Sequence, residues 1–106
     1  MNDYQHGQLA MAKYPDRVPV IINQKKGSKL TEVDKKKYLM HRDIKVSEFM
    51  FILRKKLKLE SSQGIFIFVD NKLPIHSSSF GELYDMYKDP ITEFLYVTYS
   101  GESVFG

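Results

Sequence analysis

The stretch VSEFMFILRKKL, residues 46–57, decides the fold of this 106-residue chain. Its apolar residues recur at steps of three and four positions, the spacing of one helix face: Val46, Phe49, Met50, Leu53 and Leu57. Ser47 or Asp43 is expected to cap the start of this helix, and the basic residues in its last turns complement the helix dipole. We therefore predict one main amphipathic helix near the middle of the chain.

Two strands are predicted upstream of this helix. Val18, Val20 and Ile22 alternate on one face of a strand over residues 17–23. Pro19 cannot donate to a ladder, so it is expected at an irregular position or near the strand start. Since the polar, lysine-rich segment 24–34 suits a hairpin loop, the chain is expected to return antiparallel through residues 36–40.

Downstream, residues 65–69 read IFIFV, a continuous apolar run typical of a strand covered on both faces. We predict that this is the central strand. A short helix over residues 80–87 and a last strand over residues 94–99 complete the pattern. This order predicts an α+β chain with a β-grasp, ubiquitin-like fold: a four-stranded mixed sheet, a packed main helix and a short N-terminal helix.

One domain accounts for the whole chain, because 106 residues suit a single core. The ubiquitin-like domain is expected over residues 14–99. Residues 1–13 are expected to form a shortened helical segment or tail, and residues 100–106 a flexible C-terminal tail.

Composition narrows the classes of function. The absence of cysteine excludes disulfides, thiolate metal sites and a cysteine nucleophile, and a cytoplasmic location is expected. The net charge is only +3, yet residues 13–58 hold fourteen basic against five acidic residues, and residues 59–106 two against seven. One part of the surface is therefore expected to be basic. Such a surface attracts nucleic acid, anionic lipid headgroups or acidic peptides, and charge alone does not choose among them.

No arrangement of side chains predicts catalysis. His6, His41 and His76 are far apart and none belongs to a pair at metal-ligand spacing. The serines at positions 77–79 lack a nucleophile-elbow pattern, and the carboxylates form no acid/base pair. We predict a protein that is not an enzyme, with no catalytic residue, no metal and no cofactor.

The basic segments have two interpretations. Residues 35–37 and 54–56 could bind nucleic-acid phosphates, with Tyr38 and Phe51 as stacking platforms, although solvated lysine faces are commoner. Residues 38–40 between lysines are also typical of an exposed sheet edge protected against uncontrolled pairing. Such an edge can accept a peptide strand, and its lysines favour acidic ligands. Nucleic acid is therefore not the expected partner.

Four segments, in order, resemble the autophagy-related ubiquitin-like modifiers, the family of the GABA-receptor-associated protein and microtubule-associated light chain three. They are KYPDRVPVI at 13–21, DKKKYL at 34–39, FILRK at 51–55 and YSGESVFG at 99–106. Each alone is weak evidence, but four in register are strong, and the resemblance spans nearly all of residues 13–106.

The resemblance implies a role for the C-terminal tail. Gly106 matches the glycine that is activated, passed through thioesters on activating and conjugating enzymes, and joined to phosphatidylethanolamine. A processing and deconjugating cysteine protease is an implied partner as well. The implied protein is a monomer in the cytoplasm, located on the autophagosomal membrane when lipidated. A glycine suits this chemistry because its acyl carbon is unhindered.

The resemblance also implies two pockets beside the second strand, for an aromatic-x-x-aliphatic motif in cargo receptors and adaptors. The first pocket is implied to consist of Pro19, Ile21, Lys37, Leu39 and Phe94. The second is implied to consist of Tyr38, Met40, Ile44, Phe49, Ile52 and Leu53, with Arg17 and Lys56 as nearby contacts. Most of these residues would also be core in any β-grasp protein. Ligand contact is expected above all of Lys37 and Leu39, because both flank the expected pairing edge.

The sequence differs from the usual family pattern at the N-terminus and beside both pockets. Only thirteen residues precede Tyr14, where the family usually has two helices. His6 and Ala10 align with positions that usually supply an acidic and a bulky aliphatic contact, so the first pocket is expected to be wider. His41 replaces a common proline beside the second pocket. Two alternatives to lipid conjugation stay open: a ubiquitin-like adaptor that is unconjugated or joined to proteins, and a basic nucleic-acid-binding domain.

Overall fold

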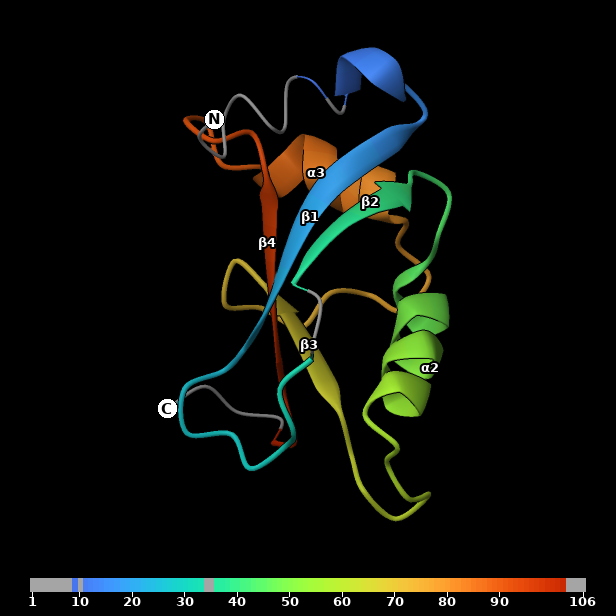
Figure 1. The fold of residues 1–106 in the computed structure, drawn as a ribbon, viewed down its shortest axis with the longest axis vertical. Helices are drawn as coiled ribbons and strands as arrows, with labels where there is room; N and C mark the ends of the chain where they lie inside the picture. Colours follow the sequence, from blue (N-terminus) through green and yellow to red (C-terminus); the bar gives the residue numbers. More distant parts are fainter. Residues whose placement is uncertain (1–8, 10, 34–35, 103–106) are drawn as a thin grey trace.

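In the computed structural model, the described part of the chain is residue 9, residues 11–33 and residues 36–102, and it forms one sheet with helices against it (Figure 1). Residues 11–13 are helical, as expected for a short N-terminal helix. The remaining elements are β1 (Arg17–Gln24), β2 (Lys37–His41), α2 (Val46–Lys56), β3 (Phe66–Val69), α3 (Phe80–Tyr87) and β4 (Leu95–Ser100). Among the described residues, none of the helices has the length and apolar character needed to cross a bilayer.

The sheet is mixed and has the strand order β2-β1-β4-β3. The predicted antiparallel pairing of β1 with β2 is confirmed. β1 and β4 run parallel at the centre, and β3 pairs antiparallel with β4. Pro19 lies just before the β1–β4 ladder, which begins at Val20, so it is near the strand start as expected.

The prediction that residues 65–69 form the central strand is wrong, because β3 is an edge strand. The run is nevertheless covered on both faces. Ile67 and Val69 belong to the main core, while Phe68, on the opposite face of the strand, is only 3% exposed. Burial of both faces explains the apolar run and does not require a neighbour on each side.

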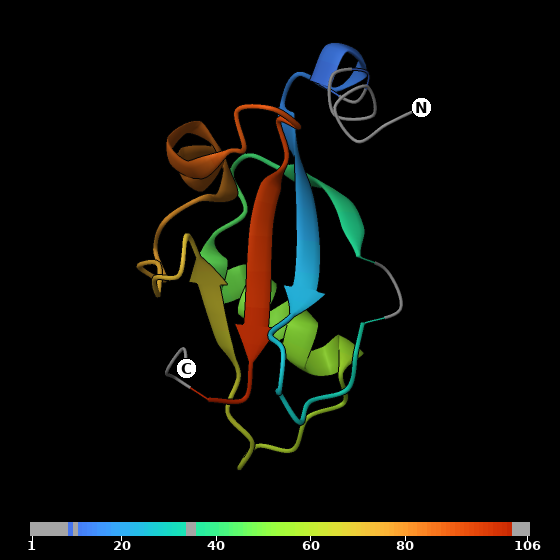
Figure 2. The same cartoon turned by 90° about the vertical axis from the view of Figure 1, so that its left-hand side faces the viewer.

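The main core lies between the sheet and the two helices, with α2 behind the sheet in Figure 2. Alternate residues of β1 point into this core because side chains along a strand alternate between faces. The facing pairs Val20 with Leu95 and Ile22 with Val97 join the two central strands. The helices contribute Val46, Phe49, Leu53, Phe80, Leu83 and Tyr84, and Leu57 joins the core just after the end of α2.

The starts of the two helices differ in how their amides are satisfied. α3 is capped by Ser79, whose hydroxyl accepts a hydrogen bond from the Glu82 N–H at 3.1 Å. The predicted caps of α2 are wrong, because the N-cap is Lys45, which leaves Ser47 inside the first turn and Asp43 upstream. The Glu48 carboxylate accepts the Lys45 N–H at 3.1 Å.

Candidate functional site

β2 is an edge strand, and its two faces belong to different surroundings. In the β1–β2 register, Pro19 faces Leu39 and Ile21 faces Lys37, whereas Val20 faces Tyr38. Side chains alternate along a strand, so Tyr38 points to the α2 side, and Lys37 and Leu39 point to the other side. A ligand strand laid along β2 would therefore meet one set of side chains on each face.

The α2 side of this edge contains an open, mainly apolar hollow of about 300 Å³. It is lined by Arg17, Tyr38, Leu39, Met40, His41, Ile44, Phe49 and Ile52. Six of these residues are those predicted for the second pocket or its surroundings: Arg17, Tyr38, Met40, Ile44, Phe49 and Ile52. The structure thus brings together side chains from β1, β2, α2 and the turn between β2 and α2.

Aromatic contacts fix one wall of this hollow. The ring centroids of Tyr38 and Phe49 are 6.3 Å apart in an edge-on arrangement, and those of Phe49 and Phe80 are 5.3 Å apart. Phe49 is 3% exposed and Phe80 is fully buried. Packing of these rings against one another and against the core therefore holds Phe49 and Tyr38 in place on this side of the hollow. Ile52, also on α2 and 40% exposed, adds accessible apolar surface to the hollow.

The rim of the hollow is polar. The His41 Nε2 lies 3.4 Å from a carboxylate oxygen of Asp16, and its Nδ1 lies 3.7 Å from one of Asp43. The Asp43 N–H donates to the same Nδ1 at 3.2 Å. Arg17, which also lines the hollow, places its guanidinium carbon 5.5 Å from the Tyr14 ring centroid. An apolar side chain would fill the hollow while polar groups beside it reach this rim.

Leu53, predicted for the second pocket, and Lys56, predicted as a nearby contact, do not line this hollow. Leu53 is fully buried in the core and does not line the hollow. Contact of Leu53 with a ligand stays a prediction, and in this structure its side chain packs in the core. Lys56 lies with its Nζ 5.6 Å from the centroid of the Tyr38 ring and lines a neighbouring hollow instead.

The residues predicted for the first pocket gather on the opposite face of the sheet. Pro19 is opposite Leu39 and Ile21 is opposite Lys37. The Lys37 Nζ lies 5.9 Å from the centroid of the Phe94 ring. Pro19, Ile21 and Phe94 are buried, and Ile21 and Phe94 lie outside the main core. Leu39 also lines the hollow on the α2 side of β2, so it contributes to both faces of this edge strand.

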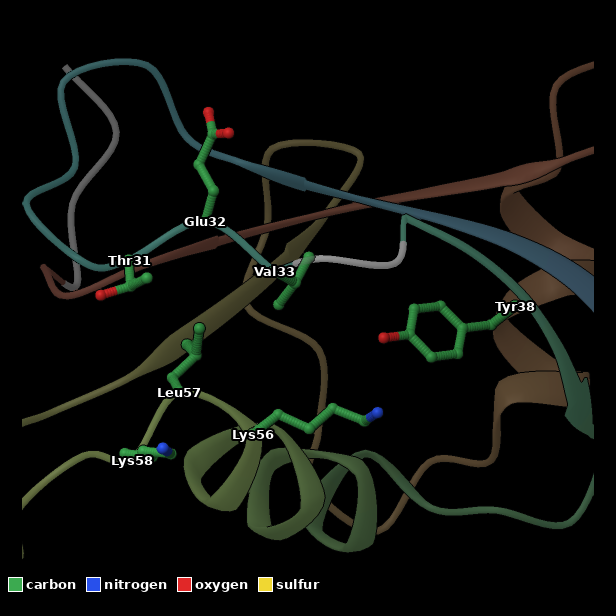
Figure 3. Close-up of a pocket in the computed structure, with 7 residues that line it drawn as sticks. All are labelled: Thr31, Glu32, Val33, Tyr38, Lys56, Leu57 and Lys58. Carbon is green, nitrogen blue, oxygen red and sulfur yellow. The ribbon is translucent and has the colours of Figure 1, made fainter.

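A third hollow, of about 520 Å³, was not predicted from the sequence. It is lined by Thr31, Glu32, Val33, Tyr38, Lys56, Leu57 and Lys58 (Figure 3). Tyr38 and Lys56 face the same space from β2 and α2, while the Glu32 carboxylate points away from them. No local pattern indicates this hollow, because it depends on how the loop after β1 is held against the end of α2.

That loop is fixed by Tyr99 of β4. The Tyr99 hydroxyl donates to the Thr31 carbonyl oxygen at 2.8 Å and accepts the Val33 N–H at 3.0 Å. Burial raises the pKa of this hydroxyl, which therefore remains protonated and able to donate. The loop wall of the third hollow is thus held by a residue that is distant in sequence.

Some predicted positions lie outside the described residues. These are Gly106 in the tail, and His6 and Ala10, which were expected to alter the first pocket. Within the described ranges, no group of three His, Cys, Asp or Glu side chains is placed to hold a metal ion.

Comparison with known proteins identifies the family. Residues 3–106 match the model of the family described as "Autophagy protein Atg8 ubiquitin like". The chain belongs to the Atg8 family. The match covers nearly the whole chain, so the predicted ubiquitin-like fold and the resemblance to autophagy-related modifiers are both confirmed.

Individual Atg8 proteins agree with this assignment. Autophagy-related protein 8e of Arabidopsis thaliana is 47% identical over 94 residues, which are 89% of this chain and 76% of that protein. Autophagy-related protein 8c of the same plant is 46% identical over 94 residues, 89% of this chain and 78% of that protein.

Solved structures extend the agreement to three dimensions. The crystal structure of Trypanosoma brucei ATG8 is 32% identical, with a TM-score of 0.87, and the match covers 98% of this chain and 89% of that one. Plasmodium falciparum Atg8, in complex with a Plasmodium falciparum Atg3 peptide, is 34% identical with a TM-score of 0.88, covering 98% and 91%.

Proposed function

We propose that this Atg8 protein is a modifier without enzymatic activity. In this proposal it is joined through Gly106 to phosphatidylethanolamine on the autophagosomal membrane, and it recruits cargo receptors and adaptors through aromatic-x-x-aliphatic motifs. The observation that carries the peptide-binding part is the apolar hollow beside the edge strand β2, lined by eight residues from four parts of the chain. Before conjugation the protein is cytoplasmic and monomeric.

Strand addition explains how such a motif would be held. A peptide laid along β2 gains main-chain hydrogen bonds at the sheet edge, and its alternate side chains point to opposite faces. The aliphatic residue enters the hollow lined by Phe49 and Ile52, and the aromatic residue contacts Leu39 and Lys37 on the other face. Because Lys36 and Lys37 are exposed at the start of β2, acidic residues in the peptide are favoured.

Plasmodium falciparum Atg8 is 34% identical to this chain, and its structure is a complex with an Atg3 peptide. That complex supports the proposal that this chain binds peptides. We therefore include conjugating and activating enzymes among the partners, together with a processing and deconjugating cysteine protease. No role for nucleic acid or for a cofactor is proposed.

Calorimetric titration with an acidic peptide tests the peptide site. The peptide carries an aromatic residue and, three positions later, an aliphatic one, and binding is compared between the natural chain and Lys37→Ala/Leu39→Ala. We expect the double variant to lose binding by about tenfold or more, because a half-buried leucine contact contributes roughly 1–2 kcal/mol and the charge contributes further.

A matched control comes from the opposite edge of the sheet. Lys72→Ala/Leu73→Ala removes the same residue types from an exposed turn beyond β3, where Leu73 is 53% exposed. This control is expected to bind like the natural chain. Equal binding by both double variants, each shown to be folded, would place the peptide elsewhere.

The conjugation step is tested separately. Gly106→Ala, incubated with the activating and conjugating enzymes and phosphatidylethanolamine vesicles, is expected to give no lipid-linked product, because the added methyl group obstructs the acyl carbon. Lipidation of the alanine variant at the natural rate would show that Gly106 is not the conjugated residue.

A further inference from the structure

The outer face of α2 carries a basic surface that the peptide site does not use. An open hollow of about 530 Å³ is lined there by Phe51, Arg54, Lys55, Lys58, Leu59 and Ser61. Three of these residues are basic and none is acidic. We call this set the Phe51 surface.

Phe51 is the unusual member of the set. It is 60% exposed and lies on the face of α2 away from Phe49 and Leu53, which are buried. The Lys55 Nζ lies 4.5 Å from the centroid of its ring. An aromatic ring held at the surface beside an ammonium group adds nothing to the core, and this combination of apolar and basic groups is typical of contact with a bilayer interface.

Arg54 joins the Phe51 surface to the loop after α2. Its guanidinium donates to the Gln63 carbonyl oxygen at 2.7 Å and to the Glu60 carbonyl oxygen at 2.8 Å. The Glu60 N–H in turn donates to the Gln63 side chain at 2.9 Å. These bonds hold the loop after α2 without neutralising the charge of Arg54, since carbonyl oxygens carry no full charge.

The same loop meets the base of the C-terminal tail. A methyl group at Gly64 would lie 3.9 Å from the Gly101 carbonyl oxygen, so the two backbones are close. Gln63, Gly64, Gly101 and Glu102 also line one shared hollow. In Figure 1, the loop after α2 and the end of β4 lie at the same end of the molecule. The tail therefore leaves the domain beside the loop that Arg54 holds.

We propose that the Phe51 surface lies against the anionic headgroups of a phospholipid bilayer. The inference rests on the proposed function, since conjugation through the tail would bring this end of the domain to the membrane. The ammonium groups of Lys55 and Lys58 contact lipid phosphates, and the Phe51 ring enters the interface. Each basic residue close to an anionic surface favours contact by about fivefold.

A bilayer fits this surface better than a nucleic acid does. Single-stranded nucleic acid needs a basic groove with several aromatic platforms for successive bases. Here one exposed ring is accompanied by the aliphatic Leu59, and the tail leaves from the same end. Contact with a planar interface uses all of these features.

The chain has no tryptophan and no cysteine, so two substitutions report on the contact directly. Phe51→Trp introduces a single indole fluorophore, and Gly106→Cys allows thiol coupling to maleimide lipid in vesicles. We expect the indole emission to shift to the blue and to be quenched by brominated lipids on vesicles rich in phosphatidylserine. The effect should be lost in high salt and on phosphatidylcholine vesicles. Because the tether needs no conjugation enzyme, this result is independent of whether natural lipidation occurs.

Two controls make the test specific. Ile91→Trp places the fluorophore at a residue 76% exposed before β4, whereas the tail follows that strand, and it should show no shift. Lys55→Glu/Lys58→Glu should weaken the contact by at least about 25-fold, since two favourable charges are lost and reversed. Lys72→Glu/Lys88→Glu changes the net charge equally, away from this surface, and should retain it.

Hydrogen exchange of the tethered chain with its natural Phe51 gives a second readout, in case the tryptophan variant does not fold. Protection over residues 51–61 on anionic vesicles is expected. An unshifted emission from the Phe51→Trp variant together with unchanged exchange would overturn the proposal. A shift produced by a single-stranded oligonucleotide but not by anionic vesicles would overturn it in favour of nucleic acid.

Discussion

The Tyr99 hydroxyl joins the last strand to Val33, 66 residues earlier, by accepting the Val33 N–H at 3.0 Å. The same hydroxyl donates to the Thr31 carbonyl oxygen. Since Val33 and the ring of Tyr99 are buried, these bonds replace water for groups that would otherwise be unpaired. One side chain of β4 thereby fixes the loop that forms a wall of the third hollow.

Tyr99→Phe is therefore expected to destabilise the fold by about 1–3 kcal/mol, because it leaves a buried amide without a partner while preserving the ring. Urea unfolding followed by circular dichroism measures the change. Tyr96→Phe is the control, since Tyr96 is 38% exposed and its hydroxyl bonds the Thr92 side chain at an exposed position. A loss in the control as large as in Tyr99→Phe would mean that the loop bonds are not the cause.

Such long-range bonds are the part of the fold that the sequence could not predict. Local periodicity identified β1, α2 and α3, because each presents an apolar face to the core. It could not place β3 at the edge, since burial of Phe68 gives an edge strand the composition of a central one. Strand order is decided by pairing between distant segments, which no local window contains.

In the candidate site, too, some features were predicted from the sequence and others depend on contacts between distant residues. The family resemblance indicated Tyr38, Met40 and Phe49 correctly as neighbours around one hollow. The resemblance also implied Leu53, which is fully buried in the core and does not line the hollow. The third hollow had no sequence signal, since its loop wall is held by Tyr99.

Gly81, in the first turn of α3, packs closely against the turn that follows β2. A methyl group at Gly81 would come within 2.9 Å of the Arg42 Cβ and 3.1 Å of the Arg42 carbonyl oxygen. The Gly81 N–H donates to that carbonyl at 2.9 Å, and the Arg42 side chain is paired with Asp85. The backbone must therefore shift if a side chain is added.

We expect Gly81→Ala to cost about 1–3 kcal/mol of unfolding free energy, as overpacking against backbone does. Thermal and urea unfolding measure it. Gly101→Ala serves as the control, because its methyl group would meet the Leu30 side chain at 3.4 Å, an ordinary contact. If both glycine variants unfold alike, the contact with Arg42 does not constrain position 81.

The Asp89 carboxylate is expected to make the stability of the fold depend on pH in the acid range. Its carboxylate accepts the N–H groups of Thr92 and Ile91, each at 2.8 Å, and these bonds lower the pKa of Asp89 below its ordinary value. A lowered pKa in the folded state means that the ionised carboxylate stabilises the fold above the unfolded pKa, about 3.9. This contribution is lost as the pH falls through the lower folded value.

Asp89→Asn should accordingly reduce stability at neutral pH and flatten the loss of stability between about pH 5 and the acid limit. Urea unfolding at a series of pH values measures both effects. Asp70→Asn, at an exposed turn, removes the same charge and serves as the charge-matched comparison. A slope in Asp89→Asn identical to that of the natural chain would contradict the assignment.

Neighbouring residues of α2 separate the two proposed surfaces. Ile52 lines the hollow beside β2, whereas Phe51, one position earlier, lines the basic surface on the outer face. Both are substantially exposed, at 40% and 60%, so alanine at either position should leave the fold intact. The two substitutions therefore act on different ligands.

Ile52→Ala is expected to weaken binding of the aromatic-x-x-aliphatic peptide by roughly tenfold, because apolar contact worth about 1–2 kcal/mol is lost. It should leave vesicle contact unchanged. Phe51→Ala should do the reverse, retaining peptide affinity and reducing the protection of residues 51–61 on tethered anionic vesicles. Calorimetry and hydrogen exchange on the same two variants measure the pattern. If either substitution weakened both ligands, the two surfaces would not be independent, and a peptide path that crosses α2 would be the better account.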